Sequence, residues 1–339
     1  MIYLKSILGE DPVLVILGGS TGKSMVSNTS LIVGLGNDYN CTIDPLNIPT
    51  FGALGGFSGS QMFYCGGWNK YEPYDKCFYY IDKWSAYGSM INPRYYAGYV
   101  TTPYGLFVAG GFNGGNCYMN KTDDLPFDGP DWTPLPDLPI YTYGSCLVQL
   151  DHDHTLLIGG IDDPDCKPES QTESDRVFMF DWIANQWSEL PKMKQKRSFA
   201  MCGQLPNGKI LVTGGEPLSN TTEIFDPKSQ KWSFAADLPM NWRHGKIVNF
   251  ENTLLLVNGW LSNVTQESDF VASDIILAYS YTIDRWIEFP KKLPSPRANA
   301  VVFLADASDF GDNCKVIENA SINLKLSHFS LLIIFIHFL

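Results

Sequence analysis

Basic residues and histidines are scarce in this chain. Its 339 residues contain 24 Lys and Arg and only 5 His against 36 Asp and Glu, so the formal net charge is −12. An acidic chain repels phosphate backbones, and we therefore expect no nucleic-acid partner. The densest basic run, at 192–197, is short and falls in a predicted turn, where we expect it to be solvated.

Long hydrophobic segments are also missing. The apolar run at the N-terminus stops at the polar residues 9–12, so we expect no secretion signal in residues 1–20. The C-terminal run 329–339 is too short to cross a bilayer as a helix, which needs about 20 residues. It follows small residues at 320–321, an order similar to a lipid-anchor signal. A read-through end and a buried or disordered tail are the alternatives.

Aromatic residues, glycine and proline are abundant instead. Hydrophobic residues make up 45% of the chain and aromatic residues 14%, with 30 Gly and 21 Pro scattered along it. This is enough apolar surface for a large core, and it argues against disorder. Short β-rich runs separated by Gly and Pro turns predict an all-β fold.

One element of the sequence repeats six times. A β-rich run ends in a glycine pair, and the first residues of successive pairs lie 44 to 55 residues apart. That period fits a propeller blade of four strands. The sixth copy carries Asn in place of the first Gly. The pairs are Gly18-Gly19, Gly66-Gly67, Gly110-Gly111, Gly159-Gly160, Gly214-Gly215 and Asn258-Gly259.

A tryptophan and an arginine follow most glycine pairs in a fixed order. In three repeats an aromatic residue stands seven positions before the tryptophan, and the arginine comes ten or eleven positions after it. The third repeat has Tyr141 and Tyr143 in place of the arginine. The tryptophans are Trp84, Trp132, Trp187, Trp232 and Trp286, and the arginines are Arg94, Arg197, Arg243 and Arg297.

This joint order resembles the kelch repeat over roughly residues 10–305. The resemblance implies an all-β, kelch-type β-propeller. It also implies structural roles for the repeated side chains. Each tryptophan would be wedged between neighbouring sheets, and each arginine would hydrogen-bond backbone carbonyls near the axis.

The number of repeats favours six blades, with a seventh incomplete blade from 296–318 as the alternative. The first copy begins too close to the N-terminus to have an innermost strand, and a spare strand-like run lies at 298–304. We expect this run to pair beside 13–17 and close the ring, which removes exposed sheet edges. The expected organisation is an N-terminal segment 1–12, a propeller 13–305, a polar segment 306–328 and a hydrophobic tail 329–339.

The middle of the chain points to an oxidising compartment. Cys65 and Cys77 flank one loop of one blade, and the resemblance to cysteine-bearing extracellular kelch proteins makes a disulfide between them plausible. Cys146 and Cys202 fall on predicted inner strands and are expected to be buried thiols. No pairing can be deduced for Cys41, Cys117, Cys166 and Cys314. Glycosylation sequons occur at Asn28, Asn40, Asn120, Asn220, Asn263 and Asn319. We expect an extracellular or cell-surface protein, with the cytoplasm as the alternative.

No active site can be assembled, and we predict no catalytic residue, cofactor or metal. The run 18–24 lacks the spacing and the helix of a phosphate-binding loop. His152-Asp153-His154 offers too few ligands and is expected to be a solvated turn. The acidic loop near 162–175 lacks the ordered spacing of a calcium loop. A galactose-oxidase-like enzyme is a less favoured alternative, because no matching copper ligands can be placed.

The predicted function is therefore recognition. We expect a binding module that recognises a protein or glycan through loops on one propeller face, chiefly 161–176 and 260–275. Membrane contact is expected only through the possible C-terminal anchor. The alternative is a cytosolic kelch adaptor, which the resemblance links to ubiquitin-ligase substrate recognition or actin binding.

Overall fold

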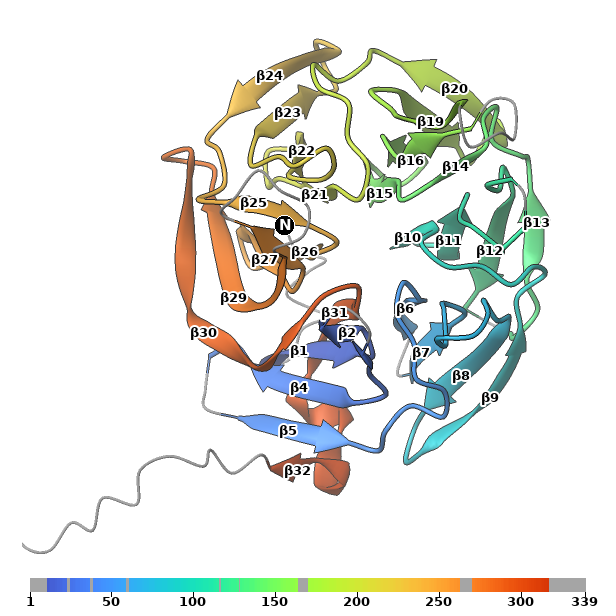
Figure 1. The fold of residues 1–339 in the computed structure, drawn as a ribbon, viewed down its shortest axis with the longest axis vertical. Helices are drawn as coiled ribbons and strands as arrows, with labels where there is room; N and C mark the ends of the chain where they lie inside the picture. Colours follow the sequence, from blue (N-terminus) through green and yellow to red (C-terminus); the bar gives the residue numbers. More distant parts are fainter. Residues whose placement is uncertain are drawn as a thin grey trace, which may run out of the picture.

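Antiparallel sheets are arranged around a central axis in the computed structural model of this chain (Figure 1). The structure describes residues 11–22, 25–36, 39–58, 61–115, 117–127, 129–163, 170–262 and 270–316. In these ranges six sheets have four or more strands, and in each one a single strand lies nearest the axis. The predicted all-β propeller is confirmed.

Four of these sheets are regular four-stranded blades, each built from strands that follow one another outward from the axis. The first contains β6 (Leu54–Ser58), β7 (Gln61–Cys65), β8 (Lys76–Tyr80) and β9 (Trp84–Ser89). The second contains β10 (Gly98–Thr101), β11 (Gly105–Ala109), β12 (Thr122–Pro126) and β13 (Thr133–Leu135). The third contains β15 (Cys146–Gln149), β16 (His154–Ile158), β19 (Val177–Asp181) and β20 (Gln186–Leu190). The fourth contains β21 (Met201–Gln204), β22 (Ile210–Thr213), β23 (Thr222–Asp226) and β24 (Lys231–Ala235).

The fifth sheet is extended by short strands at one end. It contains β26 (Lys246–Phe250), β27 (Thr253–Val257), β29 (Val271–Ser280) and β30 (Arg285–Arg297), and β29 also pairs with β28 (Trp260–Ser262), which pairs with β25 (Asn241–Arg243). Two smaller sheets stand apart. They are β14 (Thr142–Tyr143) with β17 (Ile161–Asp162) and β18 (Thr172–Glu173), and β2 (Ser20–Gly22) with β3 (Met25–Val26).

The two ends of the chain meet in the sixth sheet, whose order is β31-β1-β4-β5-β32. β31 (Val301–Asp306) pairs antiparallel with β1 (Pro12–Leu17), with Val15 opposite Phe303. The predicted closure by a C-terminal strand is therefore confirmed. The sheet continues through β4 (Ser30–Gly34) and β5 (Asn40–Ile43) to β32 (Lys315–Val316). Two 3-10 helices, η2 (Ala307–Asp309) and η3 (Gly311–Asn313), connect β31 to β32.

The C-terminal part of the described chain is attached to this sheet more firmly than the sequence indicated. Cys314 is bonded to Cys41 on β5, across a sequence separation of 273 residues. Part of the segment expected to follow the propeller thus forms its outermost strand. Both η2 and η3 are single 3-10 turns, and no helix among the described residues is long and apolar enough to cross a membrane.

Burial explains the two kinds of strand in a blade. β1 is PVLVIL with its last five residues buried, as expected for a strand covered on both faces. β9, an outer strand, buries Trp84 and then alternates between intermediate and more exposed positions. The apolar runs that precede the glycine pairs are therefore the second strands of the blades, enclosed by neighbours on either side.

The repeat tryptophans contact the preceding blade. The indole Nε1 of Trp84 donates to Asp44 O at 2.9 Å, and that of Trp232 donates to Pro191 O at 2.8 Å. Trp187 makes the same kind of bond to Pro136 O at 3.1 Å, and Trp286 bonds Thr222 Oγ1 at 3.3 Å. Trp132 packs beside a buried core cluster, and its Nε1 has no hydrogen-bond partner in the described part of the chain. These contacts hold neighbouring sheets together.

The glycine pairs turn the chain where a side chain would collide. Gly110 has φ +68°, and a Cβ there would lie 2.6 Å from Thr142 O. Asn258, in the sixth copy, adopts φ 55°. Asn is one of the few residues that tolerates this left-handed conformation, so the degenerate copy still turns in the same way.

Candidate functional site at the propeller axis

One residue from each blade forms a closed hydrogen-bonded ring around the axis. Each amide donates to the carbonyl of another member, at 2.7 to 3.1 Å, until the circle returns to its start. All six residues have positive φ, from 52° to 67°. The members are Gly52, Tyr96, Gly144, Phe199, His244 and Asn299.

Three members of the ring bring large side chains together at the axis. The Phe199 and His244 rings are stacked with centroids 4.0 Å apart, and the Tyr96 ring lies 5.0 Å from Phe199 and 5.3 Å from His244. Burial lowers the pKa of His244 to about 3, so its imidazole is neutral at physiological pH. We call these three residues the aromatic plug.

The residue before each ring member pairs with the residue that follows a glycine pair. These contacts form a second layer around the plug, on the face where the glycine pairs lie. The pairs are Phe51 with Trp68, Tyr95 with Phe112, Tyr143 with Ile161, Ser198 with Glu216, Arg243 with Trp260, and Ala298 with Ser20.

The two sides of this layer differ in their chemistry. On one side aromatic rings follow one another, with Trp68 and Tyr95 centroids 5.2 Å apart, Tyr95 and Phe112 5.6 Å apart, and Tyr118 and Tyr143 4.1 Å apart. We call this the aromatic side.

The other side is charged. Glu216 forms an ion pair with Arg243, and the Arg243 guanidinium lies 3.7 Å from the centroid of the Phe270 ring. The face thus offers stacking surfaces and ionic groups next to each other.

Both predicted binding loops begin on this face. β17 opens the loop 161–176, and the Tyr118 hydroxyl donates to Gln171 Oε1 at 2.6 Å, which links that loop to the aromatic side. β28 opens the loop 260–275, and Phe270 packs under Arg243. Residues 164–169 and 263–269 of these loops lie outside the described residues.

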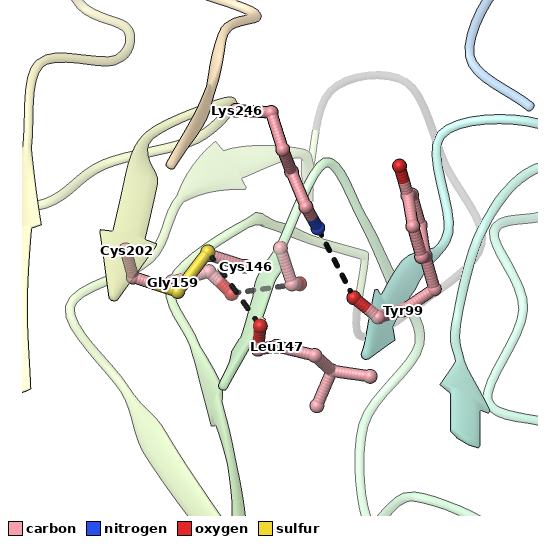
Figure 2. Close-up of a disulfide and its surroundings, with 7 residues drawn as sticks. Tyr99, Cys146, Leu147, Gly159, Cys202 and Lys246 are labelled. Carbon is pink, nitrogen blue, oxygen red and sulfur yellow. Dashed lines mark hydrogen bonds between the residues drawn. A yellow bond between two sulfur atoms is a disulfide. The ribbon is translucent and has the colours of Figure 1, made fainter. Parts of the chain in front are cut away.

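A cavity of about 100 Å³ lies on the axis, lined by the ring and the inner strands. Lys246 Nζ lies 3.9 Å from the centroid of the Tyr99 ring and donates to Tyr99 O at 3.3 Å. Figure 2 shows this lysine and the Cys146–Cys202 disulfide, both of which line the cavity. Burial lowers the pKa of Lys246 to about 8.

Three of the four repeat arginines occupy equivalent positions in their blades and make the same contact. Arg94, Arg197 and Arg297 each donate Nη1 to the carbonyl of the first glycine of a pair, at 3.3, 2.9 and 3.2 Å. All three side chains are buried. They anchor the turn that leads into the ring.

Arg243 does not take that position, which corrects the expectation from the sequence. It stands one residue later, in the layer beside the ring, where it pairs with Glu216. The anchoring place belongs to Trp242, whose Nε1 donates to Asn258 O at 2.7 Å. In another blade Thr50 Oγ1 serves the same purpose, donating to Gly66 O at 3.1 Å.

The cysteines form more bonds than the sequence indicated. Cys65 and Cys77 are joined as a disulfide. Cys146 and Cys202 are also joined, so the expectation of two buried thiols was wrong. They stand on the inner strands of neighbouring blades, β15 and β21, with their Cα atoms 6.1 Å apart, a normal distance for a disulfide. Cys117 is disulfide-bonded as well, and Cys166 lies outside the described residues.

The sequon asparagines Asn28, Asn40, Asn120 and Asn220 are all partly exposed. Asn220 Nδ2 donates to Leu238 O at 3.2 Å, whereas Asn40 begins β5 and its buried Oδ1 accepts no hydrogen bond from the residues that the structure describes. Asn263 and Asn319 lie outside the described residues, as does the tail 329–339. Glycosylation therefore stays a prediction.

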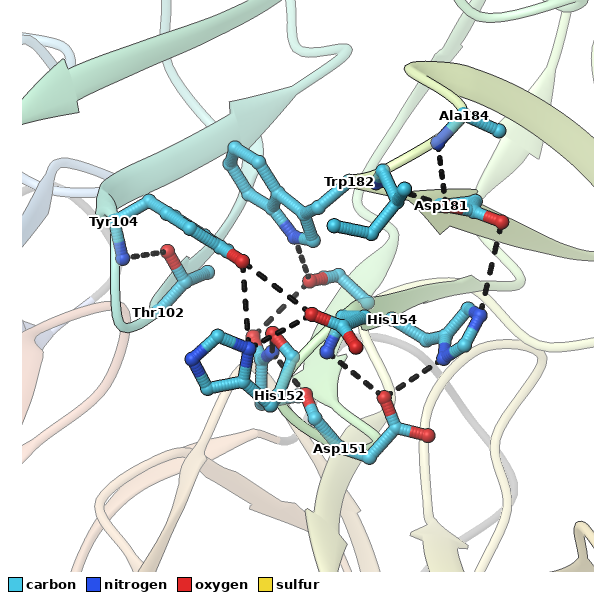
Figure 3. Close-up of polar contacts among 12 residues, drawn as sticks. Thr102, Tyr104, Asp151, His152, His154, Asp181, Trp182 and Ala184 are labelled. Atoms are coloured by element: carbon cyan, nitrogen blue, oxygen red, sulfur yellow. Dashed lines mark hydrogen bonds and ion pairs between the residues drawn. The ribbon is translucent and has the colours of Figure 1, made fainter.

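The histidine turn lies at the opposite end of the blades. His152 Nδ1 lies 2.7 Å from Asp153 Oδ1, and His154 Nδ1 lies 2.7 Å from Asp151 Oδ1. Figure 3 shows His152, His154 and Asp151 in this turn. The Tyr104 ring packs on Trp182 with centroids 4.7 Å apart. No group of three or more His, Cys, Asp or Glu suited to a metal ion occurs among the described residues.

The ring, the plug and Lys246 were not singled out from the sequence. Tyr96, Phe199 and Asn299 each stand two positions after a repeat arginine, and His244 stands two after Trp242. This constant offset is the signal that could have located the ring. Nothing in the local sequence marks Lys246, because the cavity is formed by strands from different blades.

Several known proteins are similar to this chain, although no family model matches it. Kelch-like protein 23 of Pongo abelii is 29% identical over 199 residues, 55% of this chain and 33% of that protein. Kelch-like protein 40 of Xenopus tropicalis is 24% identical, over 64% of this chain and 36% of that protein. Beta-scruin of Limulus polyphemus is 22% identical, over 69% and 21%. The matches thus span only about a third of the kelch-like proteins' own length.

A solved structure supports the same fold. The structure of YjhT superimposes with a TM-score of 0.64 at 15% sequence identity, covering 83% of this chain and 99% of that one. At this identity the likeness concerns the fold alone.

Proposed function

We propose, from the premise that this chain is a kelch-repeat β-propeller, that it is a non-enzymatic module that binds a protein or glycan through the face around the aromatic plug. The observation that carries the proposal is the composition of that face. Stacked aromatic rings lie beside the Glu216–Arg243 pair, and both long loops start there. Aromatic and arginine side chains contribute most of the binding energy at many interfaces.

The relatives support an interaction module in general, and the face supports its location. Tyr71, in the loop that follows the second glycine pair, is 80% exposed. Its ring is therefore available to a partner, as is the partly exposed Arg243. Tyr104 at the opposite end is a matched control, because it is also an exposed tyrosine in a turn.

The test compares Tyr71→Ala and Arg243→Ala with Tyr104→Ala. Purified protein is screened on a glycan array and against cell-surface proteins, and the affinity of any ligand found is then measured for each variant. We expect the two face variants to weaken binding by about tenfold or more and the control to leave it unchanged. Equal losses in all three variants, or a loss in Tyr104→Ala alone, would contradict the proposed face.

We further propose that the module is extracellular or on the cell surface. The disulfides Cys65–Cys77, Cys146–Cys202 and Cys41–Cys314 support this, since such bonds persist in oxidising compartments. The rival is a cytosolic adaptor, which the kelch-like relatives favour. Protein from eukaryotic cells should shift in mobility after glycosidase treatment and resist thiol alkylation without reductant. Unshifted protein with alkylated Cys65 and Cys77 would favour the adaptor.

A further inference from the structure

The axial cavity contains one cation, Lys246, and the carboxylate beside its lining is Glu216, whose Oε1 lies 3.6 Å from His244 Nε2. Its titratable lining residues are Tyr96, Tyr99, His244 and Lys246, and no Asp or Glu lines it in the described residues. This is unusual for a chain with a net charge of −12. Lys246 is half-buried, and removing part of a charge from water costs free energy unless it is paired, so Lys246 is poised to gain from an anion.

The contacts of Lys246 leave hydrogen-bonding capacity. An ammonium has three donors, and the described contacts of Lys246 Nζ are one carbonyl, Tyr99 O, and the face of the Tyr99 ring. Figure 2 shows the side chain extending from β26 toward Tyr99. The remaining donors are available to a bound ligand.

The rest of the lining restricts what that ligand can be. Leu147, Met201 and Ile247 contribute apolar wall, and about 100 Å³ holds only a small molecule. One positive charge matches one negative charge, and an apolar wall suits a short aliphatic body. A dianion such as phosphate would keep an uncompensated charge.

We propose that the axial cavity binds a small aliphatic monocarboxylate, whose carboxylate pairs with Lys246 Nζ and whose body packs against this wall. The plug residues Tyr96 and His244 line this cavity as well as the proposed partner-binding face, but the carboxylate proposal does not rest on partner binding. His244 and the two tyrosines stay neutral near physiological pH, because burial lowers the pKa of His244 to about 3 and raises those of Tyr96 and Tyr99. Lys246 is thus the group in the lining that titrates near pH 8.

The probe is propionate, titrated into the full-length protein and followed by ligand-observed NMR in a chloride-poor buffer. We expect saturable binding of propionate, and binding at least about tenfold weaker for its neutral analogue propionamide and for inorganic phosphate. Lys246→Met should weaken propionate by about tenfold or more, and Lys246→Arg should weaken it less. Lys228→Met, at an exposed hairpin lysine, is the matched control and should bind like the parent.

Three results would overturn the proposal: no saturable propionate binding, equal binding of propionate and propionamide, or unchanged affinity in Lys246→Met. Tighter binding of phosphate would overturn the carboxylate class. If Lys246→Met does not fold, the parent protein decides the question through its pH dependence. Affinity should fall by about tenfold or more between about pH 7 and pH 9.5, as the ammonium loses its proton. A flat profile would contradict the role of Lys246.

Discussion

The buried arginines of different blades are anchored alike but compensated differently. Arg94 forms a buried ion pair with Asp123, and Arg197 with Glu223 at 3.2 Å. Arg297 makes the same bond to a glycine carbonyl, with Thr29 as its other described partner. The residue that matches Glu223 in that blade is the apolar Leu31.

The comparison separates two contributions that the repeat pattern combines. The bond from the side chain to the glycine carbonyl is present in every case, whereas the carboxylate is present in only two blades. The pKa of Arg297 is lowered to about 10 by burial, so it remains charged at neutral pH without a carboxylate. The hydrogen bond from the side chain to the glycine carbonyl is therefore the essential part of this contact. Where the arginine also forms an ion pair, the stability of the fold additionally depends on the carboxylate that pairs with it.

The largest expected effect is that of Arg197→Met. It leaves Glu223, which is 0% exposed, without its cation, and removing one partner of a buried pair costs about 3–5 kcal/mol. Arg297→Met strands no carboxylate and should cost about 1–3 kcal/mol. Urea denaturation of both variants measures the difference in the free energy of unfolding, with the exposed Arg285→Met as control.

Equal losses in Arg197→Met and Arg297→Met would show that the carboxylate does not matter. The double variant Arg197→Met/Glu223→Met sharpens the test, because it removes both charges. We expect it to be more stable than Arg197→Met alone. The recovery should be incomplete, since Glu223 also accepts the amides of Lys194 and Gln195 at 2.7 and 3.0 Å.

Arg297 is a buried base without a carboxylate partner, and β12 contains the opposite case, a buried acid without a cation among the described residues. Asp123 on this strand pairs with Arg94, whereas the buried Oδ1 of its neighbour Asp124 has no hydrogen-bond partner among the described residues. Burial raises the pKa of Asp124 to about 7. The folded state then holds a proton that the unfolded state loses near pH 4, so stability should fall as pH rises from about 4 to 7.

Asp124→Asn should remove this pH dependence and gain roughly 2–4 kcal/mol relative to the parent near pH 8. Thermal and urea unfolding at about pH 5 and pH 8 measure it. Asp131→Asn, at an exposed position, should keep the slope of the parent protein. A parent protein whose stability does not change over this range would show that Asp124 is ionised in the fold without cost.

The sequence predicted the parts of this fold that depend on local spacing. The period of the glycine pairs indicated the blades, and the spare run near 298–304 indicated the closing strand. Spacing failed for Arg243, because both Arg243 and Arg297 follow a tryptophan by eleven residues and only Arg297 is an anchor. The residues that follow distinguish the two arginines. Arg94, Arg197 and Arg297 each have Ala three residues later, and Trp242, which takes the anchoring place beside Arg243, has the similarly small Gly at the same offset.

Contacts between blades could not be predicted from the spacing of residues in the sequence. Cys146 and Cys202 lie 56 residues apart in the chain, and only the packing of β15 against β21 brings them together. The cavity around Lys246 likewise results from the way inner strands of different blades surround the axis. Such a site depends on where whole sheets stand, which no local pattern records.

The smallest expected effect is that of Thr50→Val. This variant tests the hydrogen bond to the glycine carbonyl where a short side chain, and not an arginine, makes it. Thr50 is buried, and its hydroxyl donates to Gly66 O without any charge being involved. Valine keeps the shape and removes the donor, so the loss should be about 1 kcal/mol, the net value of one hydrogen bond. Urea denaturation measures it against Thr282→Val, whose threonine is exposed. If Thr50→Val costs as much as Arg197→Met, the carbonyl bond alone explains the anchor; a cost near zero would mean that the turn before the ring is held by the backbone ring itself.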